Sequence, residues 1–576
     1  MRGRPGRSSG VPTASSAIKQ LCETLGRRPL DRVAWRVRCP RRGNAARNVS
    51  HREKDILAPW SIRDSQNMQT EHNTAERQWL AQSGGFAHNG RYAERGRWRA
   101  ARERLARAAL VTRNTVTSAA RSAVRSQPLW VGALVMVAAG LLALAFYLNR
   151  PQPFIPFHDT GEYVRRADII LSGGAWVDAI RLPGYPLLLA LLFAFVGKSN
   201  YGAAEALQYA LFVATSVGVY ALAYRITRHT RLAGVVGLLF GLNLYFLSYF
   251  RAILSDGLGA LLIVGLALAV VLYLERPSGA RFWVVAALCF AALITRGEWI
   301  LAPIALFPYL LLVARRRGLA RQLLAPMASA LALIYGALGA YMTLNWRVNG
   351  YFGLTDATNI NLYGKITQYG MQKQAPAHFA HITAVTEAFT RRGVIDPWSI
   401  YWRNGALAGA HFSHIGAYAR AIILSHPVEY LARSAPVAFT SLYDAHVFGG
   451  YNQTGALAGF LTAAQAFSLV VYPLFMLFPV CAVVWLIGAL RLHRRGIAGQ
   501  ALIQTEALGA LSLLALYALA VTTLTTYSEY GRLHIAFDPL MLIVTLVSFA
   551  ALLGALPLPL PLPLPPRAIK REAEAR

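Results

Sequence analysis

Long apolar segments separated by short polar stretches run through the chain from residue 129 to residue 556. A helix needs about 20 predominantly apolar residues to cross a bilayer. Segments of roughly that length lie near 129–148, 204–224, 232–250, 253–274, 282–295, 298–314, 323–344, 465–490, 504–526 and 536–556. The pattern therefore predicts an all-α integral membrane protein with about ten transmembrane helices.

One further apolar run, 184–197, is about 14 residues long and is opened by Pro183 and Gly184. We interpret it as a juxtamembrane helix that lies in the interface. The positive-inside rule supports this choice, because ten spans place every strongly basic loop on the same side as the N-terminus. Those loops and the tail are "RITRHTR", "ERPSGAR", "ARRRGLARQ", "RLHRRG" and "PRAIKREAEAR". Counting 184–197 as a span would put most of these arginines outside.

Composition agrees with a membrane protein and changes how the charge is interpreted. Of the 576 residues, 55% are hydrophobic and 15% are charged, and the mean hydropathy is +0.37. The net charge of +31 resembles that of a nucleic-acid-binding protein, but residues 1–128 hold 26 Lys/Arg against 9 Asp/Glu. We expect a disordered cytosolic arm there, or sequence upstream of the true start. A surface for anionic lipid or nucleic acid is the alternative.

Charged residues gather where predicted spans reach the outer boundary of the membrane. Charges within or at the edge of a bilayer are costly and need a reason. Taken singly, each could be a helix-end cap or a snorkelling side chain. Together they resemble a cavity that holds a phosphate beside a proton acceptor. The residues concerned are Asp159, Glu162, Arg251, Ser255, Asp256, Arg296, Glu298, Glu529, Arg532 and His534.

The motifs around these charges resemble those of the GT-C class of polyprenyl-phosphate-sugar-dependent glycosyltransferases, in particular the protein mannosyltransferase and aminoarabinose transferase branch. The matching stretches are "DTGEYVRRADIILSGGAW", "RLPGYPLLLALLFAFVG", "SDGLGALL", "LITRGEW" and, more loosely, "EYGRLHIAFDPLML". The resemblance implies a GT-C-like bundle with juxtamembrane helices in the first external loop. It also implies that Asp159 is the catalytic acid and that Arg296 and Arg532 contact the donor phosphate.

The residue types suit this chemistry. A carboxylate can deprotonate an acceptor hydroxyl or amine, and arginine can bind the departing phosphate. We expect inversion, with Asp159 as general base and Glu162 beside it. The other predicted substrate-binding residues are Arg296, Arg532, Asp256, Glu298, Glu529 and Arg181. No Asp-x-Asp pair is present, so we expect no cofactor; a divalent metal is the less favoured alternative.

The expected partners are a polyprenyl-phosphate-linked sugar, a lipid, glycan or protein acceptor, and membrane lipids, without nucleic acid. We expect a multi-pass cell-envelope protein of the inner membrane. The arginine asymmetry between the loops predicts cytoplasmic termini and an outward-facing site. The sugar and the acceptor stay open, since loop 345–462 has no evident counterpart in the family. An O-antigen polymerase or ligase and a multi-span transporter are the alternative functions.

These expectations divide the chain into five parts. They are a basic arm (1–127), an N-terminal transmembrane catalytic module (128–344) with external loop 149–203, an external loop or cap (345–462), C-terminal transmembrane helices (463–556) and a Pro-rich cytosolic tail (557–576).

Overall fold

The computed structural model describes residues 127–150, 158–403, 407, 409, 411–443, 447–491, 499–554 and 556, and these form helices and no strands. The predicted all-α membrane architecture is confirmed: seven helices in these ranges are long and apolar enough to cross a membrane. The predicted arm, up to residue 126, and the Pro-rich tail lie outside the described residues.

All ten predicted spans are helical. The seven that meet the length and hydropathy of a span are Gln127–Leu148, α6 (Tyr201–Thr227), α9 (Ser255–Glu275), Gly297–Arg316 (η1, Gly297–Trp299, and α11, Ala302–Arg316), α12 (Ala320–Asn349), Ala458–Arg491 (α18, Ala458–Val471; η4, Tyr472–Leu477; α19, Phe478–Arg491) and α20 (Gly499–Thr525).

The other three predicted spans differ in length or shape. The third is a pair, α7 (Thr230–Gly241) and α8 (Leu244–Arg251), bent by 52°. Asn243 marks the break, because its side chain accepts a hydrogen bond from the backbone N of Phe246 and so caps α8. The fifth, α10 (Gly279–Thr295), has 17 residues and the tenth, α22 (Asp538–Leu552), has 15.

The first external loop folds into two short helices, α4 (His158–Leu171) and α5 (Gly184–Val196). α5 has the short length predicted for 184–197. Its first residue has to be small, because a Cβ on Gly184 would lie 2.4 Å from Oγ1 of Thr295. This close approach packs the start of α5 against the end of α10.

The segment after α12 has a hydrophobic core of its own. It contains α13 (Ala357–Gln368), η2 (Gln372–Gln374), η3 (Ala377–Phe379), α14 (Ala380–Thr390), α15 (Pro397–Trp402), α16 (Ser413–Ser425) and α17 (Pro427–Ser441). Buried side chains such as Ile360, Tyr363, Ile366, Tyr418 and Ile422 form this core.

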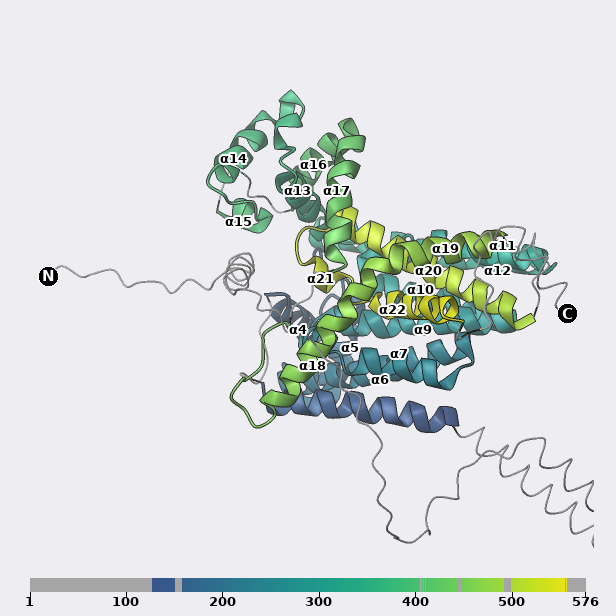
Figure 1. The fold of residues 1–576 in the computed structure, drawn as a ribbon. Coiled ribbons are helices and arrows are strands. Elements are labelled where there is room, and N and C mark those ends of the chain that lie inside the picture. Colours follow the sequence, from purple (N-terminus) through teal and green to yellow (C-terminus); the bar gives the residue numbers. More distant parts are fainter. Residues whose placement is uncertain are drawn as a thin grey trace, which may run out of the picture. The chain divides into compact units, whose positions relative to one another are not determined.

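Figure 1 shows α4, the short helix α21 (Tyr530–Leu533) and α13–α17 at the same end of the bundle. We call this the site end. The opposite ends of the long helices carry arginine–glutamate ion pairs. Arg225 and Arg228 contact Glu275, and Arg317 contacts Glu506.

Candidate active site

Helix α4 presents two of the predicted site residues, Asp159 and Glu162, one turn apart. Two contacts hold the helix against the turn between α8 and α9. The Thr160 hydroxyl donates to the Ile253 carbonyl over 3.4 Å, and the Tyr163 hydroxyl lies 3.2 Å from Oγ of Ser255. Residues i and i+3 of a helix face the same way, so both carboxylates point to one side of α4.

Arg181 joins these two carboxylates. Its Nη2 donates to Oδ1 of Asp159 over 2.5 Å, and its Nε donates to Oε2 of Glu162 over 2.6 Å. The backbone of Arg181 is fixed in turn by Asp178, whose Oδ1 accepts from the backbone N of Ile180 and of Arg181. The loop before α5 therefore delivers a guanidinium to α4.

Asp256 occupies the first turn of α9 and is fully buried. Its two oxygens contact two different arginines, Nη1 of Arg296 at 2.5 Å and Nε of Arg532 at 3.3 Å. Nε of Arg296 also donates to Oε1 of Glu298 over 2.5 Å. The pairing brings together the ends of α9 and α10 and the short helix α21.

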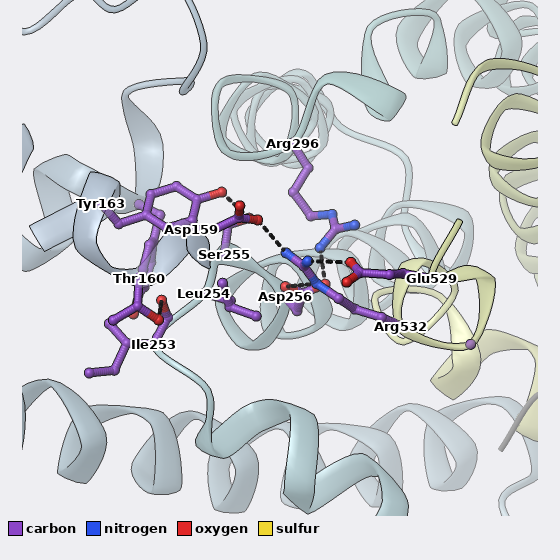
Figure 2. A network of polar contacts seen from close by, with 12 residues as sticks. Asp159, Thr160, Tyr163, Ile253, Leu254, Ser255, Asp256, Arg296, Glu529 and Arg532 are labelled. Carbon is purple, nitrogen blue, oxygen red and sulfur yellow. Dashed lines mark hydrogen bonds and ion pairs between the residues drawn. The ribbon is translucent and has the colours of Figure 1, made fainter. Parts of the chain in front are cut away.

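Arg532 is the residue that unites the separate parts of the site (Figure 2). Besides Asp256, its guanidinium contacts Oδ2 of Asp159 through Nη2 at 3.2 Å and Oε2 of Glu529 through Nη1 at 2.7 Å. Burial alone would lower the pKa of Arg532, but the nearby carboxylates Asp256, Asp159 and Glu529 raise it above its ordinary value. Arg532 therefore stays charged. Arg181 stays charged as well, because Tyr163, Asp159 and Glu162 raise its pKa in spite of its burial.

All eight predicted site residues belong to this one network of ion pairs, which we call the charge cluster: Asp159, Glu162, Arg181, Asp256, Arg296, Glu298, Glu529 and Arg532. Five carboxylates meet three guanidinium groups. A phosphate entering the charge cluster therefore has to bind guanidinium nitrogens that the carboxylates leave unused.

Two arginines offer such nitrogens. Arg181 uses Nε and Nη2, and Arg296 uses Nε and Nη1. Within the ranges that the structure describes, no hydrogen bond is formed by Nη1 of Arg181 or by Nη2 of Arg296. Terminal guanidinium nitrogens of this kind bind phosphate oxygens well.

Other charged and polar residues near the site end lie outside the charge cluster. Glu205 is buried and contacts Arg251 at 3.4 Å and Arg150 at 3.7 Å. Gln208 donates to the Tyr185 hydroxyl and to the Leu254 carbonyl. A shallow cavity of about 470 Å³ borders Gly161, Arg165 and Asp168, but no residue of the charge cluster lines it.

The described residues contain no group of three or more His, Cys, Asp and Glu side chains arranged to hold a metal ion. His411 lies 3.6 Å from Asp356, and His414 contacts the Leu407 carbonyl. The carboxylates of the charge cluster face guanidinium groups instead.

Sequence reasoning missed Lys365 in α13, a fully buried side chain whose Nζ donates to the hydroxyls of Tyr530 and Tyr369. Tyr530 lies between Glu529 and Arg532 in the chain. A single lysine in a long polar loop forms no pattern, so no sequence signal marks it. Sequence reasoning noted His534 but not its partner Asp538, whose Oδ1 lies 2.6 Å from Nδ1 of His534.

No protein-family model and no curated protein matches the chain. Among solved structures, the oligosaccharyltransferase of Archaeoglobus fulgidus in the apo form is similar over 74% of this chain, with 13% identity and a TM-score of 0.41. A second structure, described as archaeal oligosaccharyltransferase AglB in complex with an inhibitory peptide and a dolichol-phosphate, has 13% identity and a TM-score of 0.39 over the same share.

ArnT from Cupriavidus metallidurans bound to undecaprenyl phosphate is similar over 73% of this chain and 78% of its own, with 16% identity and a TM-score of 0.30. The chain spans about half the length of the archaeal structures, which are covered to 51% and 52%. AglB and ArnT are GT-C enzymes, the class that the sequence motifs resemble. At this identity and TM-score the likeness does not indicate a substrate or an activity. The residues of the charge cluster are the basis for the function proposed below.

Proposed function

We propose that the protein is a membrane glycosyltransferase that moves a sugar from a polyprenyl-phosphate donor to an acceptor, with inversion. The observation that carries this proposal is the Asp159–Arg532 pair. It joins a reachable carboxylate to a set of arginines at one end of a membrane bundle. Such a reaction needs a base and a phosphate-binding group in one site, on opposite faces of the anomeric carbon, because the acceptor attacks C1 from the side opposite the departing phosphate.

Side-chain exposure separates the possible bases. Asp159 is 20% exposed, Glu162 41% and Glu529 46%, whereas Asp256 is not exposed at all. A general base has to come within about 3 Å of the acceptor proton, so Asp256 cannot serve. Asp159 is the exposed carboxylate that contacts two arginines, and we assign it as the base. Glu162 shares Arg181 with it and orients that arginine.

Full burial also changes the role of Asp256. The sequence places it among the substrate-binding residues, but neither of its oxygens reaches the surface. Asp256 fixes Arg296 and Arg532 relative to each other, while Glu298 and Glu529 hold the outer sides of the same guanidiniums. The arginines are thus oriented before a donor arrives, which is the arrangement that stabilises a developing charge most effectively.

The reaction follows from these positions. Asp159 accepts the proton of an acceptor hydroxyl or amine, and the freed electron pair attacks C1 of the sugar. The bond between C1 and the phosphate oxygen breaks on the opposite face, and its electrons leave with the polyprenyl phosphate. Arg296 and Arg181 bind that phosphate through their unused nitrogens. The guanidiniums supply the positive charge, so we propose a reaction that needs no divalent metal.

We further propose that the site end faces outward in the inner membrane and that both termini are cytoplasmic. The arginine-rich loops at the far ends of the helices support this orientation. We also propose the division of the chain into the five parts that the sequence predicts. The catalytic groups lie in the N-terminal module, 128–344, and in the segment between α20 and α22.

The direct test uses purified protein in proteoliposomes with a polyprenyl-phosphate sugar and a mixture of envelope lipids, glycans and peptides. Release of free polyprenyl phosphate reports sugar transfer, and mass spectrometry identifies the product and the anomeric configuration. Wild type is expected to release the lipid phosphate and Asp159→Asn is not. Growth of a glycan by repeat units would indicate a polymerase, and lipid-independent solute uptake a transporter.

A further inference from the structure

The short connection between α20 and α21 has an unusual backbone. Ser528 and Glu529 have φ angles of +63° and +51°, and neither is glycine. A non-glycine residue in this left-handed region is strained by its Cβ, and such a conformation persists only where the surroundings enforce it. The strained pair directly precedes Tyr530 and Arg532, so whatever holds it also sets the position of Arg532.

One face of α13 provides the hold. Oδ1 of Asn361 accepts a hydrogen bond from the backbone N of Tyr527 over 3.4 Å. Gly364 leaves room for the Tyr527 ring, since a Cβ there would lie 2.6 Å from Cγ of Tyr527. Lys365 donates to the Tyr530 hydroxyl over 2.6 Å, and that hydroxyl donates to Oε1 of Gln368 over 2.8 Å.

We call Asn361, Gly364, Lys365 and Gln368 the α13 clamp. Their spacing of i, i+3, i+4 and i+7 puts all four on one side of the helix. They contact both ends of the strained pair, Tyr527 before it and Tyr530 after it. A contact on only one side would let the chain relax by rotation about Ser528 and Glu529.

Lys365 is the least expected member of the α13 clamp. Burying an ammonium group is costly unless it is paired. Among the described residues, however, the Lys365 Nζ has phenol hydroxyls as hydrogen-bond partners and forms no ion pair with a carboxylate. Burial lowers the pKa of Lys365 to about 7. The Nζ also lies over the rings of Tyr369 and Tyr530, 5.0 Å and 4.5 Å from their centroids. A basic side chain kept in this buried position, with tyrosines as its partners, indicates a task beyond packing.

We propose that Lys365 and Tyr530 are positioning residues for sugar transfer. Through them the α13 clamp fixes α21, so that Arg532 stays in contact with Asp159 and Asp256. This inference rests on the proposed function, because it gives the segment 345–462 a part in aligning the base with the leaving group. Small displacements of aligned catalytic groups reduce turnover strongly.

The test combines kinetics with backbone exchange in the full-length protein. The variants are Lys365→Met and Tyr530→Phe, the second of which removes one hydroxyl from a folded core. The controls are Thr358→Ala, on the exposed side of α13, and Tyr443→Phe, an exposed tyrosine. We expect kcat to fall about 10-fold to 100-fold in both test variants, KM for the donor to change less than 3-fold, and hydrogen exchange to rise across residues 527–533. The controls should match wild type.

The two test changes should also combine non-additively, since each breaks the same contact. Unchanged exchange across 527–533 in both variants would show that the α13 clamp does not hold the segment. Faster exchange with unchanged kcat would reduce Lys365 to a structural residue and overturn the proposal. If wild type transferred no sugar, the proposed function and the positioning role would fall together, while the exchange data would still report whether the α13 clamp exists.

Discussion

The Nη2 atom of Arg532 lies 3.2 Å from Oδ2 of Asp159, although 373 residues separate the two in the chain. The same guanidinium contacts the fully buried Asp256. Three distant parts of the sequence, the first external loop, the start of α9 and the turn before α22, thus meet at one arginine. This arrangement permits tests that separate the roles of the individual groups.

The first prediction concerns the donor phosphate. Arg296→Met removes a guanidinium whose Nη2 forms no hydrogen bond with the described residues, so donor KM should rise about 10-fold or more if the charge-assisted contact is worth roughly 1.5–3 kcal/mol. Arg296→Lys should rescue only part of this loss, because lysine lacks the planar fork. Steady-state kinetics with varied donor will measure it. Equal donor KM in wild type and Arg296→Met would contradict the assignment.

The second prediction concerns orientation. In a cysteine-free background, a cysteine at Thr358 should react with a membrane-impermeant maleimide in intact cells, and a cysteine at Arg321 should react only after lysis. Thr358 and Arg321 are both exposed, so access to the reagent is the remaining variable. The reverse labelling pattern would place the charge cluster on the cytoplasmic side and end the proposal of an outward-facing site.

The third prediction concerns the N-terminal arm. Every residue of the charge cluster lies at position 159 or later, and residues 1–125 hold 26 Lys/Arg and 9 Asp/Glu with little apolar periodicity. Protein that begins at residue 126 should insert and retain turnover within about 2-fold, since the removed segment contains no predicted span and no member of the charge cluster. Loss of turnover with normal insertion would give the arm a role in substrate use.

The fourth prediction follows from the lowered pKa of Lys365. Between about pH 7 and the ordinary value of 10.5, the unfolded protein binds the Lys365 proton and the folded protein does not. The free energy of unfolding should therefore rise with pH in this window, by up to about 1.4 kcal/mol per pH unit. The groups facing the amine are Tyr369, directly after α13, and Tyr530 on α21, and Tyr430 on α17 packs against Tyr369.

Melting temperatures in detergent at pH 6.5 and pH 9 will check this effect. The difference between wild type and Lys365→Met should shift in favour of wild type at the higher pH, since all other titrating groups are common to both. Parallel curves for the two proteins would mean that Lys365 stays protonated in the fold.

The sequence predicts the helices well because apolar length is a local property. It also indicates seven of the eight members of the charge cluster, because charges at the ends of spans are rare and costly, and the motif "RLPGYP" in the first external loop adds Arg181. It does not predict which of them pair, since Arg532 meets Asp159 only through the packing of α4 against the α8–α9 turn and of α21 against α9. The bend at Asn243 had a local signal, an N-cap residue within "LNLYF", that the length of the apolar run concealed.

Burial is the other property that sequence could not supply. Asp256 and Asp159 both follow the pattern of an acid at a helix end, and only the structure separates a fully buried carboxylate from a reachable one. The burial of Lys365 was missed in the same way, because its partner Tyr530 lies on α21, 165 residues away in the chain.

The central claim is that Asp159 is the general base, and the most direct measurement is the turnover of Asp159→Asn beside that of Glu162→Gln, with donor binding followed in parallel. Asparagine keeps the shape, and its one carbonyl oxygen can still accept a hydrogen bond from Arg181 or Arg532, but it cannot take the proton. Turnover should fall by about 10²–10⁴ in Asp159→Asn with donor affinity nearly unchanged, and by much less in Glu162→Gln. Near-normal turnover in Asp159→Asn together with loss of activity in Glu162→Gln would contradict the account and assign the base to Glu162.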